Sequence, residues 1–292
     1  MEMEQIVEKL ERERKAIHKI KLVGYVCILI GGYLLFWTGL KWYLSVICII
    51  VGLGIKSHST KKREDYIEAY KNELVTEILK EEFDDVVFKP HVGVSKEQID
   101  RGSLGDYGNK MVSKHAFEGS YKGIPFLFSH LTCIEQSKKK DEVREKTLFE
   151  GNWISFGLGK EFTGEVQIHR IIELNYKSYL EKIEFEDVKF NKEFKTYATN
   201  AHLAFYLITP PMMERIKKLG DRSFISTLDL DLCFENGCLH TMIKSLEMNA
   251  FEPNIYSKIN LEKVKEKVIG GVSAIKDYVD LLGLDSWGYK AV

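Results

Sequence analysis

The most distinctive hydrophobic pattern is an apolar run, Val23–Ile55, whose single charged residue is Lys41. As one helix this run of about 33 residues would be about 50 Å long, at about 1.5 Å per residue. The hydrocarbon core of a bilayer is about 30 Å thick, so one straight span would be too long. We therefore expect a hairpin of two short membrane-spanning helices, about Leu22–Trp37 and Leu40–Ile55, with its turn at Lys41.

Basic residues flank the apolar run on both sides. By the positive-inside rule both flanks lie in the cytoplasm, and only an even number of spans places them there together. A multi-pass hairpin with both termini cytoplasmic fits this pattern. A single tilted span and a buried pair of core helices in a soluble protein are the alternatives. The basic residues are Arg12, Arg14, Lys15, Lys19 and Lys21 before the run, and Lys56, Lys61, Lys62 and Arg63 after it.

Glycines occur in both predicted spans. Small residues let membrane helices approach each other closely, although glycine is also common in such helices without a packing role. We expect the set as a whole to serve helix packing. These glycines are Gly24, Gly31, Gly32, Gly52 and Gly54.

Amphipathic helices are predicted on both sides of the apolar run, over Glu4–Lys21 and Lys62–Phe83, because apolar residues recur there at helical spacing. Their polar faces mix Glu with Lys. This mixture favours a packed antiparallel stalk over a helix that lies on the membrane surface. The apolar positions are Ile6, Leu10, Ile17 and Ile20 in the first helix, and Tyr66, Ile67, Tyr70, Leu74, Ile78 and Leu79 in the second.

Between Val86 and Arg170 short apolar runs alternate with Gly, Ser and charged residues, which predicts β-strands. Two of these strands are expected to meet at a Lys122–Gly123 turn. Residues 149–153 (FEGNW) repeat the pattern of residues 117–121 (FEGSY). A glycine inside a strand marks a bulge or a close backbone approach. We expect the polar stretch 91–114 to be a loop, and the polar stretch 137–146 to be a solvated tip or a loop.

Helix signals return in the second half of the chain. Residues Ala201–Ile208 predict a short helix with Asn200 as its N-cap, and Thr209 is the expected cap of a helix that ends at Gly220. An apolar stripe from Leu261 to Leu282 predicts a long C-terminal helix.

The combined pattern predicts an α+β fold: an N-terminal transmembrane helical hairpin, then a cytoplasmic domain of antiparallel strands with flanking helices. The expected parts are a cytoplasmic N-terminal helix (1–21), the two spans (22–55), an amphipathic stalk helix (56–83), an α+β globular domain (84–252) and a C-terminal amphipathic helix with its tail (253–292).

Composition excludes several classes of protein. The 42 basic and 43 acidic residues are balanced, whereas a dedicated nucleic-acid binder would carry a basic excess. Two of the five cysteines, Cys27 and Cys48, lie in the predicted spans. The remaining three are an odd set, which is typical of reduced cytosolic thiols and not of a disulfide framework. They are Cys133, Cys233 and Cys238.

Several motifs resemble the bacterial family catalogued as domain of unknown function 3137. The resemblance extends over about residues 83–251 and implies a membrane-anchored bacterial protein of the plasma membrane. It implies no reaction, because the family has no assigned catalytic residues. The motifs are Asp187–Thr199 (DVKFNKEFKTYAT), Ala204–Pro210 (AFYLITP), Met213–Ile216 (MERI) and the Phe-x-Gly strand motifs at Phe117 and Phe149.

The most promising metal-ligand set lies in the predicted hairpin Phe224–Ile243, whose two-residue turn is Asn236–Gly237. That turn places Cys233 opposite His240, with two aspartates on the same strand face. A Cys, a His and two Asp could hold Zn²⁺, but no second metal motif accompanies them, and a solvated strand face explains the aspartates equally well. We therefore predict no metal or cofactor. The candidate residues are Asp229, Asp231, Cys233 and His240.

No arrangement in the sequence predicts catalysis. Ser129, His130 and Cys133 are neighbours only along the chain, and neither a G-x-S-x-G motif nor a P-loop occurs. We therefore favour a membrane-tethered module whose cytoplasmic domain binds or scaffolds a protein or lipid partner. The alternatives are a membrane-associated enzyme on an unrecognised scaffold and a regulatory or assembly subunit of a membrane complex.

Overall fold

The computed structural model describes residues 2–37, 42–101, 108–139, 142–170, 179–221, 230–244 and 250–287. The chain forms two compact units. The helical unit consists of residues 1–78 and 251–266, and the sheet unit consists of residues 79–250 and 267–292. The fold is α+β, with an antiparallel sheet and flanking helices, as the sequence predicts.

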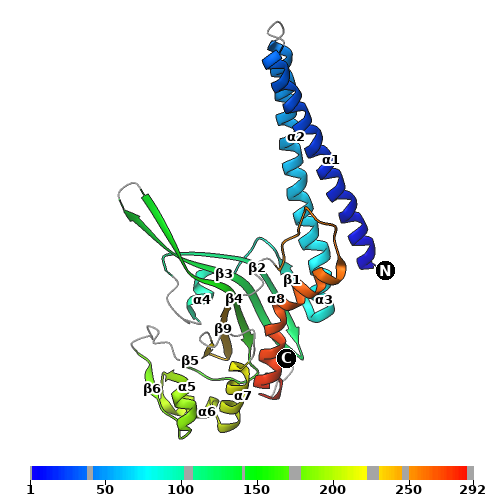
Figure 1. Ribbon diagram of the computed structural model, residues 1–292. Helices are drawn as coiled ribbons and strands as arrows, with labels where there is room; N and C mark the ends of the chain where they lie inside the picture. The colour runs from blue at the N-terminus through cyan, green and yellow to red at the C-terminus, as the bar shows by residue number, and fades with distance from the viewer. Residues whose placement is uncertain are drawn as a thin grey trace. The chain divides into compact units, whose positions relative to one another are not determined.

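Two long antiparallel helices, α1 (Glu2–Trp37) and α2 (Trp42–Ala69), pack along each other in the helical unit (Figure 1). The predicted amphipathic helices are therefore continuous with the apolar run. A π-helical turn, η1 (Tyr70–Val75), follows α2 and leads into α3 (Thr76–Glu82). The expected turn, with Lys41, falls outside the described residues. Among the described residues, one helix is long and apolar enough to cross a membrane, over Met3–Leu34.

Small residues line the contact between α1 and α2. A Cβ atom added to Gly31 would lie 2.7 Å from Ile49 Cγ1, and one added to Gly52 would lie 2.6 Å from Ile28 Cγ1. Gly24 faces α2 as well, with Ile55 Cγ2 3.2 Å from its added Cβ. The predicted packing role is thus confirmed for three glycines. It is wrong for Gly32 and Gly54, where an added Cβ meets nothing within 4 Å.

A segment without helix or strand, residues 251–260, docks on the charged half of the helix pair; we call it the strap. The Glu11 carboxylate accepts a hydrogen bond of 2.6 Å from the backbone N–H of Ile259. Lys71, which is 4 % exposed, donates 2.5 Å to the Glu252 carboxylate. Leu10 and Ile17 of α1 are buried in this half of the unit, on the apolar stripe that the sequence predicts.

The sheet unit is built on nine strands in the order β1-β2-β3-β4-β9-β8-β5-β7-β6, and the neighbouring described strands run antiparallel. The long strands β2, β3 and β4 form one side of this sheet (Figure 1). The strands are β1 (Asp84–Lys89), β2 (Lys110–Tyr121), β3 (Ile124–Lys139), β4 (Glu142–Gly157), β5 (Glu165–Arg170), β6 (Glu181–Ile183), β7 (Phe194–Ala198), β8 (Asp231–Glu235) and β9 (Cys238–Lys244).

Six helical segments of the described residues accompany the sheet. The longest, α8, packs on one sheet face: its Tyr278 ring stacks on Phe156 with centroids 6.0 Å apart, and its hydroxyl lies 2.9 Å from Thr241 Oγ1. On the opposite face Trp153 and Met242 join a buried cluster with Val94 and Ile99. The helices are α4 (Lys96–Arg101), α5 (Val188–Glu193), α6 (Ala201–Leu207), α7 (Pro210–Gly220), α8 (Leu261–Leu282) and the 3₁₀ turn η2 (Leu284–Trp287).

Local turn and cap predictions are largely confirmed. Positive φ angles occur at Lys122 (51°), Gly123 (76°), Asn236 (45°) and Gly237 (80°), where the two hairpins were expected to turn. The Asn200 side chain caps α6 by accepting from Leu203 N at 2.9 Å. Thr209 precedes α7, but its side chain makes no capping hydrogen bond.

The loop prediction for 91–114 needs correction, whereas the exposed strand ends in 137–146 agree with a solvated tip and not with a loop. The 91–114 stretch contains α4 and the start of β2, and the 137–146 stretch consists of the ends of β3 and β4, apart from residues 140–141, which lie outside the described residues. In the second case charged side chains occupy both strand faces. Lys110 donates 2.8 Å to Glu145 across the sheet, so pairing with neighbouring strands, and not apolar alternation, maintains the strand there.

Candidate functional site

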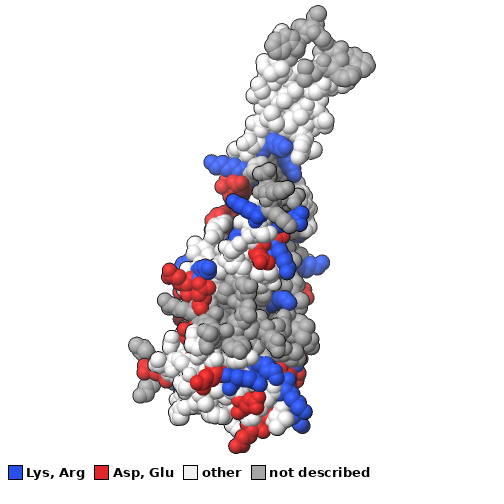
Figure 2. Space-filling view, turned by 90° about the vertical axis from the view of Figure 1, so that its left-hand side faces the viewer, with Lys and Arg blue, Asp and Glu red and all other residues white. Residues whose placement is uncertain are grey.

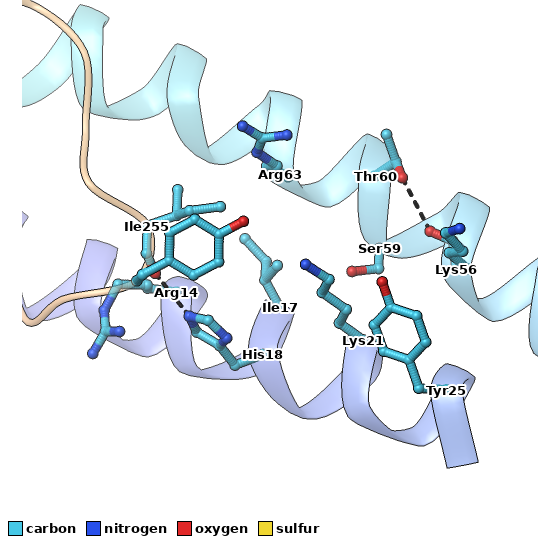
Figure 3. A pocket seen from close by; sticks show the side chains of 11 residues that line it. Arg14, Ile17, His18, Lys21, Tyr25, Lys56, Ser59, Thr60, Arg63 and Ile255 are labelled. Carbon is cyan, nitrogen blue, oxygen red and sulfur yellow. Dashed lines mark hydrogen bonds between the residues drawn. The ribbon is translucent and has the colours of Figure 1, made fainter. Parts of the chain in front are cut away.

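A cavity of about 170 Å³ lies in the helical unit between α1, α2 and the strap (Figure 3). We call it the basic pocket, because four of its described lining residues are Lys or Arg and none of them is Asp or Glu. α1 contributes residues at helical spacing, α2 contributes a second row, and the strap closes one side. The lining residues are Arg14, Ile17, His18, Lys21, Tyr25, Lys56, Ser59, Thr60, Arg63, Ile255 and Tyr256.

The basic pocket lies where the apolar run ends on both helices. Lys21 directly precedes Leu22, and Lys56 directly follows Ile55. The antiparallel register brings these ends together, since a Cβ added to Gly24 would be 3.4 Å from the Lys56 backbone nitrogen. In Figure 2 the described surface of the apolar part is free of charged side chains, and Lys and Arg side chains begin where it ends.

Two aromatic rings lie among the lysines of the basic pocket. The Lys21 ammonium is 5.9 Å from the centroid of the Tyr25 ring and 5.6 Å from that of Tyr256. The Lys56 ammonium is 6.0 Å from the Tyr25 ring. Cations within about 6 Å of an aromatic face are attracted by its quadrupole. These contacts hold both ammonium groups at the mouth of the pocket without neutralising them.

Among the described residues, no ion pair involves Lys21, Lys56 or Arg63. Arg14 differs from them, because two hydrogen bonds of 3.0 Å tie its guanidinium to the carboxylate of Glu11. The pocket therefore holds a local excess of positive charge. Two hydroxyl groups also line the pocket. Ser59 is 4 % exposed, and the Thr60 hydroxyl donates a hydrogen bond of 3.1 Å to the Lys56 carbonyl oxygen.

Two hydrogen bonds fix the strap over the pocket. His18 Nε2 lies 2.7 Å from the Ile255 carbonyl oxygen, and Glu11 accepts from Ile259 N. The Arg14 hydrogen bond lowers the pKa of the Glu11 carboxyl, and the Ile259 N–H lowers it further against the opposing effect of burial. Glu11 therefore stays charged well below neutral pH and holds the strap throughout the physiological range.

The metal candidates are only partly brought together. Cys233 and His240 face each other across β8 and β9, as the register argument predicts. However, Asp231 Oδ1 lies 2.8 Å from His169 Nδ1, and Cys233 Sγ lies 3.6 Å from Glu165 Oε1. Asp229 falls outside the described residues. Within the described parts of the chain, no three His, Cys, Asp or Glu side chains form a group that could hold a metal.

The structure also contains a buried polar network that the sequence reasoning missed. Tyr179 donates 2.6 Å to Glu165, which accepts 2.6 Å from the Gln167 amide. The Gln167 carbonyl oxygen lies 3.1 Å from His169 Nε2, and the ring continues to Asp231. The alternation of polar residues at 165, 167 and 169 in the run EVQIHR was the available signal, because it places three polar side chains on one face of β5.

The nucleophile candidates are not arranged for catalysis. Ser129 Oγ lies 2.8 Å from Ser113 Oγ, whereas the His130 ring lies 3.3 Å from Asn152 Oδ1. Successive residues of β3 point to opposite faces, so these two side chains diverge. Burial raises the pKa of the Cys133 thiol to about 11. The reactive form is the thiolate, so Cys133 is protonated at neutral pH.

A second cavity, of about 350 Å³, lies against β4 and β9 in the sheet unit. Trp153 and His240 form one wall, with their rings stacked at 5.8 Å between centroids. Cys238 and Ser155 also line this cavity. Glu235 is the one Asp, Glu, Lys or Arg among its described lining residues, so this cavity is less charged than the basic pocket.

Comparisons with known proteins give a likeness to one family over part of the chain, and that family has no described activity. The crystal structure of the mycobacterial trehalose monomycolate transport factor A, TtfA, aligns with a TM-score of 0.40 and 10 % sequence identity, over 72 % of this chain and 93 % of that one. A likeness at this level carries no argument about function. No curated protein matches the chain. Residues 147–284 match the family described as protein of unknown function (DUF3137), and the resemblance read from the sequence is thereby confirmed.

Proposed function

We propose that this protein is a membrane-anchored binding module. In this proposal α1 and α2 cross the bilayer as a two-span hairpin, both termini lie in the cytoplasm, and the sheet unit binds or scaffolds a protein or lipid partner there. The family resemblance suggests the plasma membrane of a bacterium as the location. The observation that carries the proposal is the exposed apolar surface of α1 and α2.

Large apolar side chains are exposed around both helices between residues 22 and 53. Leu29 is 72 % exposed and Ile50 is 61 % exposed. Soluble monomers rarely expose contiguous apolar patches of more than a few hundred Å², so this surface favours lipid contact over a buried helix pair in a soluble protein. The exposed residues are Leu22, Val23, Tyr25, Val26, Leu29, Ile30, Tyr33, Tyr43, Val46, Ile47, Ile50, Val51 and Leu53.

The buried positions of this region support two packed spans over one tilted span. Gly24, Gly31 and Gly52 are buried while the residues on either side of each are exposed, and Ser45 is buried next to the exposed Val46. Membrane helices typically have small residues where they contact each other and large apolar residues on their outer surface. Each apolar stretch of about 15 residues is about 22 Å long, which is shorter than the hydrocarbon core. Lys21 and Lys56 can compensate by extending toward the headgroups.

The experiment is a topology assay on the full chain. Reporters that are active only in the cytoplasm or only outside it are fused at Met1 and at Val292. We expect both ends to report the cytoplasm, because basic residues flank both spans. The control Lys41→Ala should give the same topology, since the flanking clusters determine orientation. Reports from opposite sides would contradict the two spans, and release of the chain by alkaline carbonate would contradict the anchor itself.

A further inference from the structure

We propose that the basic pocket binds a phosphate group, presented by the headgroup of an anionic membrane lipid. The inference deepens the proposed function, and it rests on the membrane anchor, since only an inserted hairpin brings the pocket to the headgroup layer. In this proposal the helical unit binds a lipid headgroup in addition to crossing the bilayer.

Charge is the first argument. Lys21, Lys56 and Arg63 line one cavity from two helices, and none of its described lining residues is acidic. Arg14 is already neutralised by Glu11. Three cations that lack an ion-pair partner in the described parts of the chain repel one another, and a bound anion relieves that repulsion. A lysine recognises phosphate as a point charge, and an arginine can bind two of its oxygens at once.

Size and donors agree with a phosphate. The cavity of about 170 Å³ corresponds to about five or six water molecules at about 30 Å³ each, which is enough room for a phosphate group. Figure 3 shows the Lys21 side chain lying between α1 and α2, with the Ser59 hydroxyl beside it. Hydroxyl groups beside cations are suited to the remaining phosphate oxygens.

Position favours a lipid over a free anion. The pocket opens where the apolar run stops, and Leu22 and Tyr25 beside it are 65 % and 44 % exposed. A phosphate bound there would have its acyl chains next to these exposed side chains. Tyrosine rings prefer the membrane–water interface, and Tyr256 of the strap is 70 % exposed at the pocket wall. Basic pockets between membrane helices on the cytoplasmic side are suited to anionic headgroups.

The alternative explanation is that these basic residues only orient the protein in the membrane. Two triple variants of the full chain separate the explanations, because they remove equal charge. The pocket variant is Lys21→Gln, Lys56→Gln and Arg63→Gln. The control variant is Lys19→Gln, Lys61→Gln and Lys62→Gln, whose exposed side chains belong to the same helices but do not line the pocket.

Binding is measured in mild detergent with fluorescent phosphatidylglycerol, with phosphatidylcholine as the zwitterionic probe and inorganic phosphate as competitor. We expect the pocket variant to weaken phosphatidylglycerol binding at least tenfold and the control variant to weaken it less than twofold. Equal weakening by both variants, or equal binding of phosphatidylcholine by the wild type, would overturn the inference. If inorganic phosphate binds as tightly as the lipid and depends on the same residues, the lipid assignment is wrong.

The single variant Arg63→Gln covers the case in which the pocket variant fails to fold. Its side chain is exposed, so folding should be preserved, and we expect about a threefold loss of phosphatidylglycerol binding. An unchanged affinity would count against the pocket. Carbonate extraction of the same variants distinguishes the two proposals. A variant that stays in the membrane but no longer prefers phosphatidylglycerol affects the lipid site alone, whereas a wild type that is extracted contradicts the anchor.

Discussion

At residue scale, the backbone angles show which glycines have a conformational role. Gly237 has a φ of 80°, and Asn236 before it has a φ of 45°. Together they make the two-residue turn between β8 and β9 that Asn-Gly favours. Gly270 lies inside α8, where an added Cβ meets nothing within 4 Å. The same side chain should therefore have opposite effects at these two positions.

We predict that Gly237→Ala destabilises the protein by about 1–2 kcal/mol, the cost of an L-residue in the left-handed region. Gly270→Ala is the matched control and should stabilise it by up to about 1 kcal/mol, because alanine restricts the unfolded chain and favours helix. Thermal and urea unfolding in detergent measure both effects. Destabilisation of equal size by both variants would mean that the turn is not under conformational constraint.

The buried polar network from Tyr179 to Asp231 shows a second effect of single residues on stability, which is the loss of a hydrogen-bond partner. Gln167 is 1 % exposed and links Glu165 with His169 through its amide. With this orientation of the amide, both ring nitrogens of His169 face oxygen acceptors. Leaving a buried polar group without its partner costs about 1–3 kcal/mol of folding stability. Removing one side chain of the network should therefore destabilise the fold, because its buried neighbour loses a hydrogen bond.

At the scale of elements, the contact between α1 and α2 depends on which side of a helix a glycine faces. Gly31 faces α2, where an added Cβ would be 3.0 Å from the Ser45 carbonyl oxygen, whereas Gly32 next to it faces open space. The backbone of α1 approaches α2 closely only because side chains are absent at such positions.

We predict that Gly31→Leu separates the two helices and destabilises the helix pair by about 1–3 kcal/mol, the usual cost of overpacking. Gly32→Leu adds the same atoms on the outer face and should be neutral or slightly stabilising, since leucine is the better helix former. Thermal unfolding in detergent, together with protease sensitivity of α1, distinguishes the variants. Similar losses in both would show that the two helices do not pack as described.

At the scale of the whole molecule, the chain passes between the two units more than once. The first part of α8 and the strap belong to the helical unit, whereas residues 267–282 of α8 belong to the sheet unit. Tyr278 belongs to the second part and is fully buried against Phe156 and Thr241. The sheet unit therefore contains the contacts of Tyr278 in α8 without residues of α1 or α2.

We predict that a fragment of residues 79–292 is soluble and unfolds cooperatively, with both helix and sheet signals in circular dichroism. The matched variant Tyr278→Ala should lose about 3–5 kcal/mol in that fragment, the range for removing a large buried aromatic side chain. A fragment that remains unfolded would show that the sheet unit depends on the helical unit for its stability. A Tyr278→Ala variant as stable as its parent would show that α8 does not dock there.

Helix α4 could be predicted from the local sequence only in part. It has six residues, among which Ile99 is buried, and it is too short for a periodic pattern. Yet Ser95 and Gln98 form a capping box: Ser95 N donates 2.9 Å to the Gln98 side chain, and Gln98 N donates 3.2 Å to Ser95 Oγ. The Ser-x-x-Gln spacing was present in the sequence and identifies the start of the helix.

The sequence by itself determined the apolar run, the amphipathic helices, the Asn236–Gly237 turn and the cap at Asn200. Each of these depends on residues within a few positions of one another, so spacing and side-chain type suffice to predict it. The same holds for the likeness to a family, whose motifs are contiguous in the sequence and whose match covers residues 147–284.

Only the tertiary structure decided which elements meet. β4 pairs with β9, and β5 lies between β7 and β8, although alternation tells only which residues share a face and not which strand lies beside them. The basic pocket combines Lys21 of α1, Arg63 of α2 and Tyr256 of the strap, and the polar network joins Glu165 to Asp231. Such sites depend on long-range packing, in which many distant segments must satisfy their contacts at once, and no local pattern records that choice.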